Sequence, residues 1–420
     1  MVRVLHASDF HLDSAYGGLS PEQARQRRQE SRDLVRAMVD YGNDHGAQLL
    51  LLAGDLLDSD AVYGQTGAEL SAALSAFRGE VVIAPGNHDY YTAGSPYATT
   101  LWSENVHIFT APAMERIAFP QYGCVVYGAA FTEGEVTERG LSGFSPEEED
   151  GALVKIGLLH GEVGSKDSHY RPVSVEDIAK SGLDYLALGH VHRYDGVQTA
   201  GSVSYAYCGC LEGRGFDELG EKGFLLGDIG AGTVAMRFIP FARRHYCIHS
   251  VDVTGRDLGE AIMESLPPRT EDDLYRIILT GERSEEGEDL SALEQQLSPK
   301  FYQLELRDNR TARRDIWVGW GGFPAGHFPA EDEAAPRGGG KRRGAAENRI
   351  GCPLRRRCLG RQRVRGEGHE ANFDDWHRRY YRQRNGRRRS DPRVDYGTAA
   401  VLRPLRGQGV PCGLRAALQP

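Results

Sequence analysis

Side chains that can bind metal ions follow apolar stretches at five separate places in this sequence. The five stretches are VLHASDFH, LLLLAGDLLD, VVIAPGNHD, IGLLHG and LALGHVH. The side chains that they deliver are Asp9, His11, Asp55, Asn87, His160, His190 and His192. Each stretch alone has an ordinary explanation, because Pro, Gly, Asn and Asp are frequent in turns. Their repetition in one chain is better explained by a single shared site.

The types of these ligands indicate which metals and which chemistry the site would support. Aspartate and asparagine offer oxygen, histidine offers imidazole nitrogen, and the set contains no thiolate. Mixed nitrogen and oxygen sites suit Mn²⁺, Fe or Zn²⁺. Seven ligands are too many for one tetrahedral ion, but they suit two ions about 3.5–4 Å apart that share a carboxylate. Such a pair clamps a phosphoryl group, so the sequence predicts phosphoester hydrolysis.

The elements around these side chains predict an α/β domain. Continuous apolar strands are expected at 2–8, 48–55, 81–86, 155–161 and 185–192. Helices are expected at 20–46, 66–77 and 174–182, and antiparallel strands close the domain at 202–209, 222–229 and 233–241. Ser20 is the expected N-cap of the first helix, with Pro21 at its first position. In α/β sheets ligands bind at the carboxyl ends of strands, so the seven side chains are expected to converge.

Composition and length limit the classes of protein to consider. The 420 residues are 40% hydrophobic and 26% charged, as in an ordinary globular protein with room for two or three domains. No apolar run reaches about 18 residues, so we expect no membrane span. The N-terminus has no apolar core typical of a signal peptide. The seven cysteines are scattered and lack zinc spacing, which predicts reduced thiols and a cytoplasmic location.

The pattern of residue types in the sequence changes twice along the chain. From about residue 249 a β-α-β-α-β pattern follows within about 60 residues, which predicts a small α/β domain. We therefore expect a catalytic domain at 1–245, a small domain at 246–317 and a tail at 318–420. The net charge changes sign at the second boundary: residues 1–317 contain 28 Lys and Arg against 49 Asp and Glu, whereas residues 318–420 contain 22 against 10.

The tail has two interpretations. Leu, Ile, Val and Phe make up about 15% of it, which is typical of a basic disordered segment. Alternatively it is an out-of-frame translation, because the codon classes of PAEDE, read one base later, permit a helix-forming sequence. Sequencing the gene across the codons for Asp315 to Phe323 distinguishes the two, and an intact single frame would exclude the second.

The order D-x-H, G-D, G-N-H-D, H-G and G-H-x-H resembles the calcineurin-like metallophosphoesterases over about residues 1–240. The resemblance implies a four-layer α-β-β-α sandwich with a two-metal site at its edge. Carried over by motif, Asp9, His11 and His192 would hold one metal, whereas Asn87, His160 and His190 would hold the other, and Asp55 would bridge them. His88 would be catalytic, close to the phosphate, and would protonate the leaving oxygen or stabilise the transition state.

Two further features resemble the DNA-repair exonucleases related to the bacterial SbcD nuclease subunit. One is the opening SDFHLDSAYGG together with GDLLD and GNHDYY, and the other is a small capping domain directly after the catalytic domain. The resemblance implies Mn²⁺, with Fe or Zn²⁺ as alternatives, and DNA as substrate. It also implies a coiled-coil ATPase of the SMC type as partner, and we weigh a homodimer as well. The acidic balance of residues 1–317 argues against DNA, because phosphate contacts need Lys and Arg.

Two alternatives remain at this point. The same motifs serve phosphoesterases that act on small molecules or phosphoproteins, and the substrate alone distinguishes them from nucleases. The other alternative is a scaffold that has kept the fold and lost its chemistry, which the presence of His88 and all seven candidate ligands disfavours.

Overall fold

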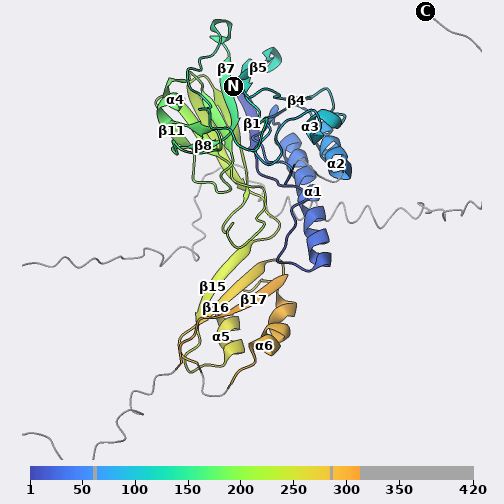
Figure 1. Ribbon diagram of the computed structural model, residues 1–420, viewed down its shortest axis with the longest axis vertical. Helices are drawn as coiled ribbons and strands as arrows, with labels where there is room; N and C mark the ends of the chain where they lie inside the picture. The colour runs from blue at the N-terminus through green and yellow to red at the C-terminus, as the bar shows by residue number, and fades with distance from the viewer. Residues whose placement is uncertain (60–63, 284–286, 313–420) are drawn as a thin grey trace, which may run out of the picture. The chain divides into compact units, whose positions relative to one another are not determined.

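Two six-stranded sheets lie face to face and form the body of the protein (Figure 1). The computed structural model describes residues 1–59, 64–283 and 287–312. Both sheets consist mainly of parallel strands, each followed by a loop or a helix. The predicted α/β class is therefore confirmed.

The first sheet carries three of the strands that were expected to deliver metal ligands. Its strands follow the order β14-β13-β1-β2-β3-β4. Their bounds are β1 (Val2–Ala7), β2 (Leu49–Leu52), β3 (Glu80–Ile83), β4 (Val106–Ile108), β13 (Gly223–Gly230) and β14 (Thr233–Pro240). Strands β1 to β4 pair in parallel, whereas β13 pairs antiparallel with β1 and with β14, as predicted. The carboxyl ends of β1, β2 and β3 therefore lie side by side.

The second sheet carries the other two ligand-bearing strands, in the order β11-β12-β10-β7-β6-β5. Its bounds are β5 (Glu115–Phe119), β6 (Cys124–Gly128), β7 (Val154–His160), β10 (Tyr185–Gly189), β11 (Gln198–Ala200) and β12 (Val203–Tyr207). The prediction of an antiparallel strand at 202–209 was wrong for its main pairing, because β12 runs parallel to β10. The short edge strand β11 precedes β12 and makes the antiparallel pairing with it. The chain therefore reverses before β12 begins.

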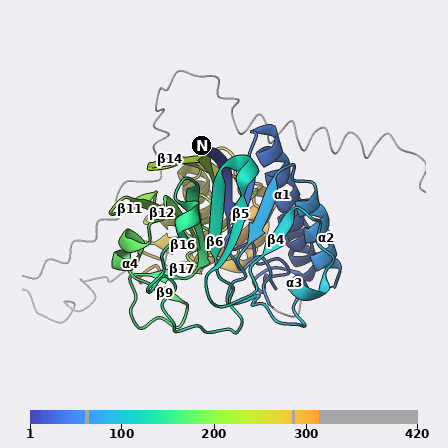
Figure 2. The ribbon, with the colours of Figure 1, turned by 90° about the horizontal axis from the view of Figure 1, so that it is seen from above.

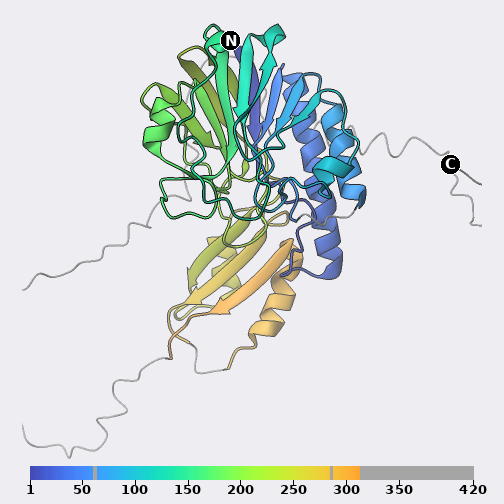
Figure 3. The same cartoon turned by 45° about the horizontal axis from the view of Figure 1, so that its top comes forward.

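Helices cover the outer faces of both sheets (Figure 2, Figure 3). They are α1 (Pro21–Asp44), α2 (Gly64–Ser75) and α3 (Pro96–Thr99) on the first sheet, and α4 (Val175–Lys180) on the second. The predicted cap of α1 is present: Gln23 N donates to Ser20 Oγ, and Ser20 N donates to Gln23 Oε1, each at 3.2 Å. This reciprocal capping box satisfies two backbone donors at the start of the helix.

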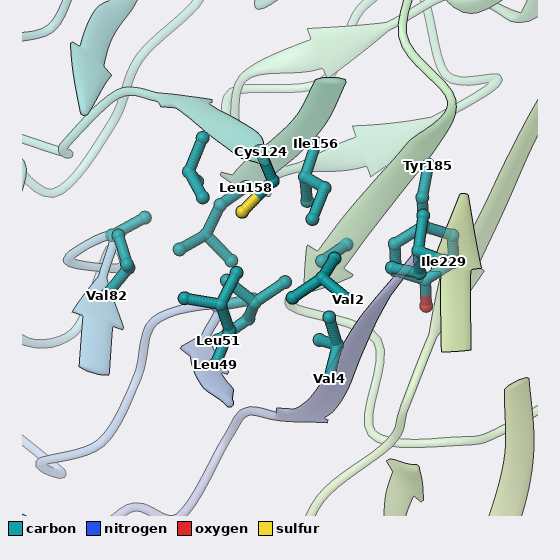
Figure 4. Packing of buried hydrophobic residues seen from close by; sticks show 14 of the residues in the cluster. Val2, Val4, Leu49, Leu51, Val82, Cys124, Ile156, Leu158, Tyr185 and Ile229 are labelled. Atoms are coloured by element: carbon teal, nitrogen blue, oxygen red, sulfur yellow. The ribbon is translucent and has the colours of Figure 1, made fainter. Parts of the chain in front are cut away.

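The main core lies between the two sheets (Figure 4). Val4, Leu51 and Val82 from the first sheet pack there against Ile156 and Leu158 from the second, among other buried side chains. The opposite faces of the strands pack against helices. Ile178 of α4, for example, packs against the outer face of the second sheet. Burial on both faces explains why these strands are continuously apolar in sequence. The layers α, β, β and α are those of the predicted sandwich.

A third sheet forms a small domain of its own. It has strands β15 (Tyr246–Asp252), β16 (Leu274–Thr280) and β17 (Gln303–Asp308), with helices α5 (Leu258–Ser265) and α6 (Leu290–Leu297) between them. The strands are parallel, and both helices pack on the same face through a core that includes Val251, Ile262, Ile277 and Leu297. The element order is the predicted β-α-β-α-β. We call the unit formed by these five elements the small domain.

The remaining short elements are a two-stranded ladder of β8 (Glu162–Val163) and β9 (Pro172–Val173), and 3-10 turns η1 (Pro120–Tyr122), η2 (Glu148–Asp150) and η3 (Ser298–Lys300). The predicted tail at 318–420 and the end of the predicted small domain lie outside the described residues, and the boundaries at 245 and 317 stay predictions. Within the described part of the chain, no helix has both the length and the apolar character that crossing a bilayer requires.

The core between the sheets provides a test of the sandwich. Leu158 has no exposed surface and packs between the two sheets, whereas Leu101 is 92% exposed. We expect Leu158→Ala to lower the free energy of unfolding by about 2–5 kcal/mol, because it removes buried methyl groups and leaves a cavity. Leu101→Ala is the matched control and should change it by less than about 0.5 kcal/mol. Urea unfolding of both variants measures the difference, and similar values would contradict the assigned core.

Candidate metal centre

The seven predicted ligands lie at the carboxyl ends of five parallel strands drawn from both sheets. The first sheet supplies Asp9, His11, Asp55 and Asn87 after β1, β2 and β3, whereas the second supplies His160, His190 and His192 from β7 and β10. The side chains of Asp9, His11, Asp55 and His160 are buried, with at most 1% of each residue exposed. The site therefore joins the two sheets at one edge of the sandwich.

The backbone of this centre is held in an unusual conformation. Asp9, His11, Asp55 and His190 have positive φ angles of 55°, 43°, 52° and 100°. Such values cost a residue with a side chain about 1–3 kcal/mol and persist only where the surrounding structure imposes them. A further constraint acts on Gly86, because a Cβ there would lie 2.1 Å from Asp55 Oδ1. The glycine of the GNHD motif is therefore needed for the close approach to Asp55.

Two histidines face each other on one side of the centre. His11 Nδ1 lies 3.2 Å from Asp58 Oδ1, and His192 Nδ1 lies 2.7 Å from Glu218 Oε1. Carboxylates accept hydrogen bonds, so both Nδ1 atoms donate. In the neutral rings each Nε2 therefore carries a lone pair, and the two Nε2 atoms are 3.2 Å apart. Two facing lone pairs repel unless a cation or proton lies between them, so this pair of imidazoles fits a metal ion.

Asp9 completes this first group of ligands. Its carboxylate Oδ1 lies 3.5 Å from His192 Nε2. Asp9, His11 and His192 offer ligand atoms that all lie within 4.8 Å of one another. The same carboxylate accepts the backbone N–H of His190 at 3.1 Å, which ties the end of β10 to the end of β1. The three residues that motif resemblance assigns to one metal are thus brought together.

On the second side of the centre, a hydrogen bond again determines which ring nitrogen of the histidine donates. His160 Nδ1 lies 2.8 Å from the carbonyl oxygen of Ala53, so Nδ1 donates. Its Nε2 then faces Asn87 Oδ1 at 2.9 Å and Asp55 Oδ2 at 3.4 Å. A neutral Nε2 lone pair directed at two oxygens again calls for positive charge between them. His190 lies next to this group, with its ring centroid 5.1 Å from that of His160.

Asp55 lies between the two groups. Its Oδ2 is 3.4 Å from His160 Nε2 and 3.7 Å from His11 Nε2, so one oxygen faces an imidazole from each side. The other oxygen, Oδ1, accepts the backbone N–H of His88 at 3.0 Å. A carboxylate in this position can bridge two metal ions. Among the described residues, the other candidate groups of ligand atoms within 4.8 Å are Asp9, Asp55 and His160, and His11, Asp58 and His88.

The pKa values of the side chains in this centre show its attraction for positive charge. Burial opposes protonation of His160, but the Asp55 carboxylate outweighs burial and raises the pKa of His160 to about 9. Burial also acts against protonation of His192, yet Asp9 and Glu218 raise its pKa to about 9. For His190, burial and repulsion from His160 lower the pKa to about 4. Although burial opposes ionisation of Asp55, the imidazoles hold its pKa well below its usual range.

His88 and Asp89 differ sharply although they are neighbours. His88 is exposed, and its ring centroid lies 4.9 Å from that of His11. Asp89 has no exposed surface and accepts hydrogen bonds from the N–H groups of Leu56 (2.7 Å) and Gly86 (2.8 Å) and from Tyr97 Oη (2.5 Å). Asp89 therefore holds the loop after β2 against the loop after β3. His88 stands at the mouth of the centre.

Three residues that the sequence did not single out as site residues support the predicted ligands. Asp58 and Glu218 accept from the two facing histidines, and Arg214 donates to both carboxylates, at 3.1 Å to Asp58 Oδ1 and 2.9 Å to Glu218 Oε1. Asp58 follows Asp55 closely within LLLLAGDLLD, so the strand-end argument gives it a weak signal. Arg214 and Glu218 lie in EGRGFDELG, where neither spacing nor periodicity distinguishes them from an ordinary polar loop.

The fold and the centre together define a metallophosphoesterase sandwich, and comparison with known proteins agrees. Residues 2–194 match the model of the calcineurin-like phosphoesterase family. Proteins of this family use divalent metal ions. The chain is also 32% identical over 245 residues to the uncharacterized metallophosphoesterase YhaO of Bacillus subtilis strain 168. That similarity covers 56% of this chain and 59% of YhaO, so less than two thirds of YhaO is spanned.

The raised histidine pKa values predict that the stability of the protein without metal depends on pH, and that bound metal reduces this dependence. His160 and His192 have folded pKa values of about 9 against an ordinary 6.5, so they stabilise the metal-free fold below pH 6.5 and lose this contribution as the pH rises through about 9. We expect the Tm of EDTA-treated protein to fall by several degrees between pH 6.5 and about 9. Protein loaded with Mn²⁺ should fall less, because cations take the place of the protons.

Thermal melts of both forms in matched buffers measure this difference. Side-chain hydrogen bonds to Asp273 and Glu221 raise the pKa of His245 to about 10. His245 therefore contributes the same dependence of Tm on pH to both forms, and its contribution cancels in the comparison. Parallel Tm curves for the two forms would contradict the attraction for cations.

Proposed function

We propose that the chain is a two-metal-dependent phosphodiester hydrolase and that its substrate is DNA. The observation that carries the hydrolase proposal is the position of Asp55, whose single Oδ2 faces an imidazole on each side. Asp9, His11 and His192 would hold one cation. Asn87, His160 and His190 would hold the other. Two divalent cations supply Lewis acidity, which stabilises the charge that develops on phosphoryl oxygens.

His88 would act on the substrate rather than on the metals. It is exposed at the mouth of the centre, and its Nδ1 lies 3.3 Å from the carbonyl oxygen of Asp58. Because that carbonyl can only accept, Nδ1 donates and Nε2 is left for the phosphate. An imidazolium in this position, protonated on Nε2 as well as on Nδ1, can donate the Nε2 proton to a leaving oxygen. The backbone N–H of His88 donates to Asp55, so His88 is held next to the Asp55 carboxylate.

Three features support DNA as the substrate. The motifs SDFHLDSAYGG, GDLLD and GNHDYY resemble those of DNA-repair exonucleases. A small α/β domain follows the catalytic domain directly, in the same order as in those enzymes. The site opens to solvent at His88 and at Asp58, whose side chain is 33% exposed, so a polymer can approach it. We infer Mn²⁺ as the working cation from the same resemblance, with Fe or Zn²⁺ as alternatives.

The proposed partners rest on the sequence resemblance. An SMC-type coiled-coil ATPase is the expected partner, and its docking region would follow the small domain, outside the described residues. A homodimer is a further proposal. Both would be tested by size-exclusion chromatography of the full chain, alone and with the ATPase.

A second candidate function is hydrolysis of phosphate esters in small molecules or phosphoproteins. The acidic balance of residues 1–317, with 28 Lys and Arg against 49 Asp and Glu, favours it, because DNA binding is driven by cationic side chains. One experiment separates the two. The full chain, loaded with Mn²⁺, is incubated with linear duplex DNA and, separately, with bis-p-nitrophenyl phosphate, each with and without EDTA.

The outcomes of that experiment are distinct. EDTA-sensitive release of nucleotides from DNA supports the nuclease proposal. Hydrolysis of the small diester alone, with DNA untouched even when the ATPase is added, would refute DNA and leave the second candidate. Inactivity towards both substrates in protein shown to contain metal would refute the hydrolase proposal.

Substitution of His88 and Asp55 tests their separate roles. We expect His88→Ala to keep both metals and to lose turnover by about 10²–10⁴-fold, because it removes only a proton donor. We expect Asp55→Ala to lose metal, because the carboxylate between the two groups is gone. Metal content by elemental analysis, measured beside turnover of the small diester, checks both variants. Equal metal loss in the two variants would contradict this division of roles.

A further inference from the structure

One loop touches both the metal centre and the small domain. It comprises residues 212–218, between β12 and β13, and is called the bridging loop here. We propose that the bridging loop positions the His11 and His192 side of the centre from the small domain, so that the affinity of one metal depends on that domain. This inference rests on the proposed two-metal function and names Arg214, Phe216 and Glu218 as positioning residues.

The bridging loop contacts the centre through a glutamate and an arginine. Glu218 is 9% exposed and its Oε1 lies 2.7 Å from His192 Nδ1. Arg214 donates to the same oxygen at 2.9 Å, and its own backbone N–H donates to Glu218 Oε2 at 2.8 Å. Its other terminal nitrogen donates to Asp58 Oδ1 at 3.1 Å, the oxygen that accepts from His11. One guanidinium thus links the two carboxylates that orient both facing histidines.

The bridging loop contacts the small domain through an aromatic side chain. The ring of Phe216 meets that of Tyr246 edge to face, with centroids 5.1 Å apart. The guanidinium carbon of Arg276 lies 4.1 Å from the centre of the Phe216 ring, which is a cation–π contact. Tyr246 begins β15 and Arg276 lies on β16. Phe216 therefore rests on the small domain, two residues along the chain from Arg214.

The other end of the loop is held at the same junction. Glu212 is 6% exposed, and its Oε1 accepts from Arg27 at 2.8 Å and from the backbone N–H of Arg244 at 3.0 Å. Arg244 also binds Glu30 of α1 at 2.7 Å. Because α1 and the chain leading into β15 hold one end while Phe216 holds the middle, the loop cannot shift independently of the small domain.

The two sides of the centre differ in what supports them. His160 is oriented by the carbonyl of Ala53 at 2.8 Å, and its Nε2 faces Asn87. These groups belong to strand ends of the two large sheets, and the bridging loop does not supply them. A change in the position of the small domain should therefore alter the metal site of His11 and His192 and leave the site of His160 as it is.

A metal titration of the full chain tests this proposal. Mn²⁺ is added to the metal-free protein, and binding is followed by calorimetry and by the electron paramagnetic resonance of free Mn²⁺. We expect Glu218→Gln to weaken one of two metal equivalents by about 10–100-fold, the usual effect of losing a partner of a ligating histidine. Phe216→Ala acts one step further away and should weaken the same equivalent by about 3–10-fold. The second equivalent should keep its affinity in both variants.

Two further variants make the test specific. Arg276→Ala changes a residue of the small domain and leaves the core between the two large sheets intact. It should weaken the same metal equivalent as Phe216→Ala. Phe144→Ala is the matched control, because Phe144 is also half-buried and meets Tyr127 edge to face with centroids 5.1 Å apart. It should change neither affinity. Melting curves of each variant establish that it is folded at the temperature of the titration.

The outcomes distinguish this proposal from the function on which it rests. Equal weakening of both equivalents, or unchanged affinities in Phe216→Ala and Arg276→Ala, would overturn the coupling. Wild-type protein that binds no Mn²⁺, or binds a single equivalent, would instead contradict the two-metal function.

Discussion

The structure depends on two carboxylates buried at the ends of adjacent strands. Asp9 and Asp55 have at most 1% of their surface exposed, and burial of such charges is costly unless opposite charge is close by. The required positive charge comes from the other sheet: His192 faces Asp9, and His160 faces Asp55. The pairing explains why the two sheets meet with their carboxyl ends at one edge. It also explains why the site attracts protons when no metal is bound. We propose that it holds two cations when divalent metal is available.

Much of the surrounding structure serves to keep this charge cluster in place. Four of the seven predicted ligands have positive φ angles, a conformation that side chains disfavour. The apolar strands behind them, buried on both faces, are rigid enough to impose it. Asp89 adds to this by accepting four hydrogen bonds in a buried position, which fastens the loops after β2 and β3 together. Strain in the loops is thus offset by packing in the layers beneath.

Support for the histidines comes from different parts of the molecule. The carbonyl of Ala53, at the end of β2, orients His160, whereas a loop nearly 30 residues beyond β10 supplies Glu218 to His192. Such second partners fix which ring nitrogen is left for a metal. The two sides of one centre therefore depend on different segments of the fold. The same loop carries Phe216 to the small domain, so the small domain contacts the loop that supplies Glu218 to the centre.

By itself the sequence determined the α/β class, the order of the ligand-bearing strands, the element order of the small domain and the identity of the candidate ligands. Strand ends marked by Asp, Asn and His are local signals, and buried strands are recognisable from their continuous apolar runs. Only the tertiary structure decided the parallel pairing of β12, which the brief reversal at β11 concealed, and the roles of Asp58, Arg214 and Glu218. The physical reason is that the contacts of these three residues with one another and with the facing histidines join positions up to 156 residues apart through hydrogen bonds whose partners have no fixed spacing in the chain.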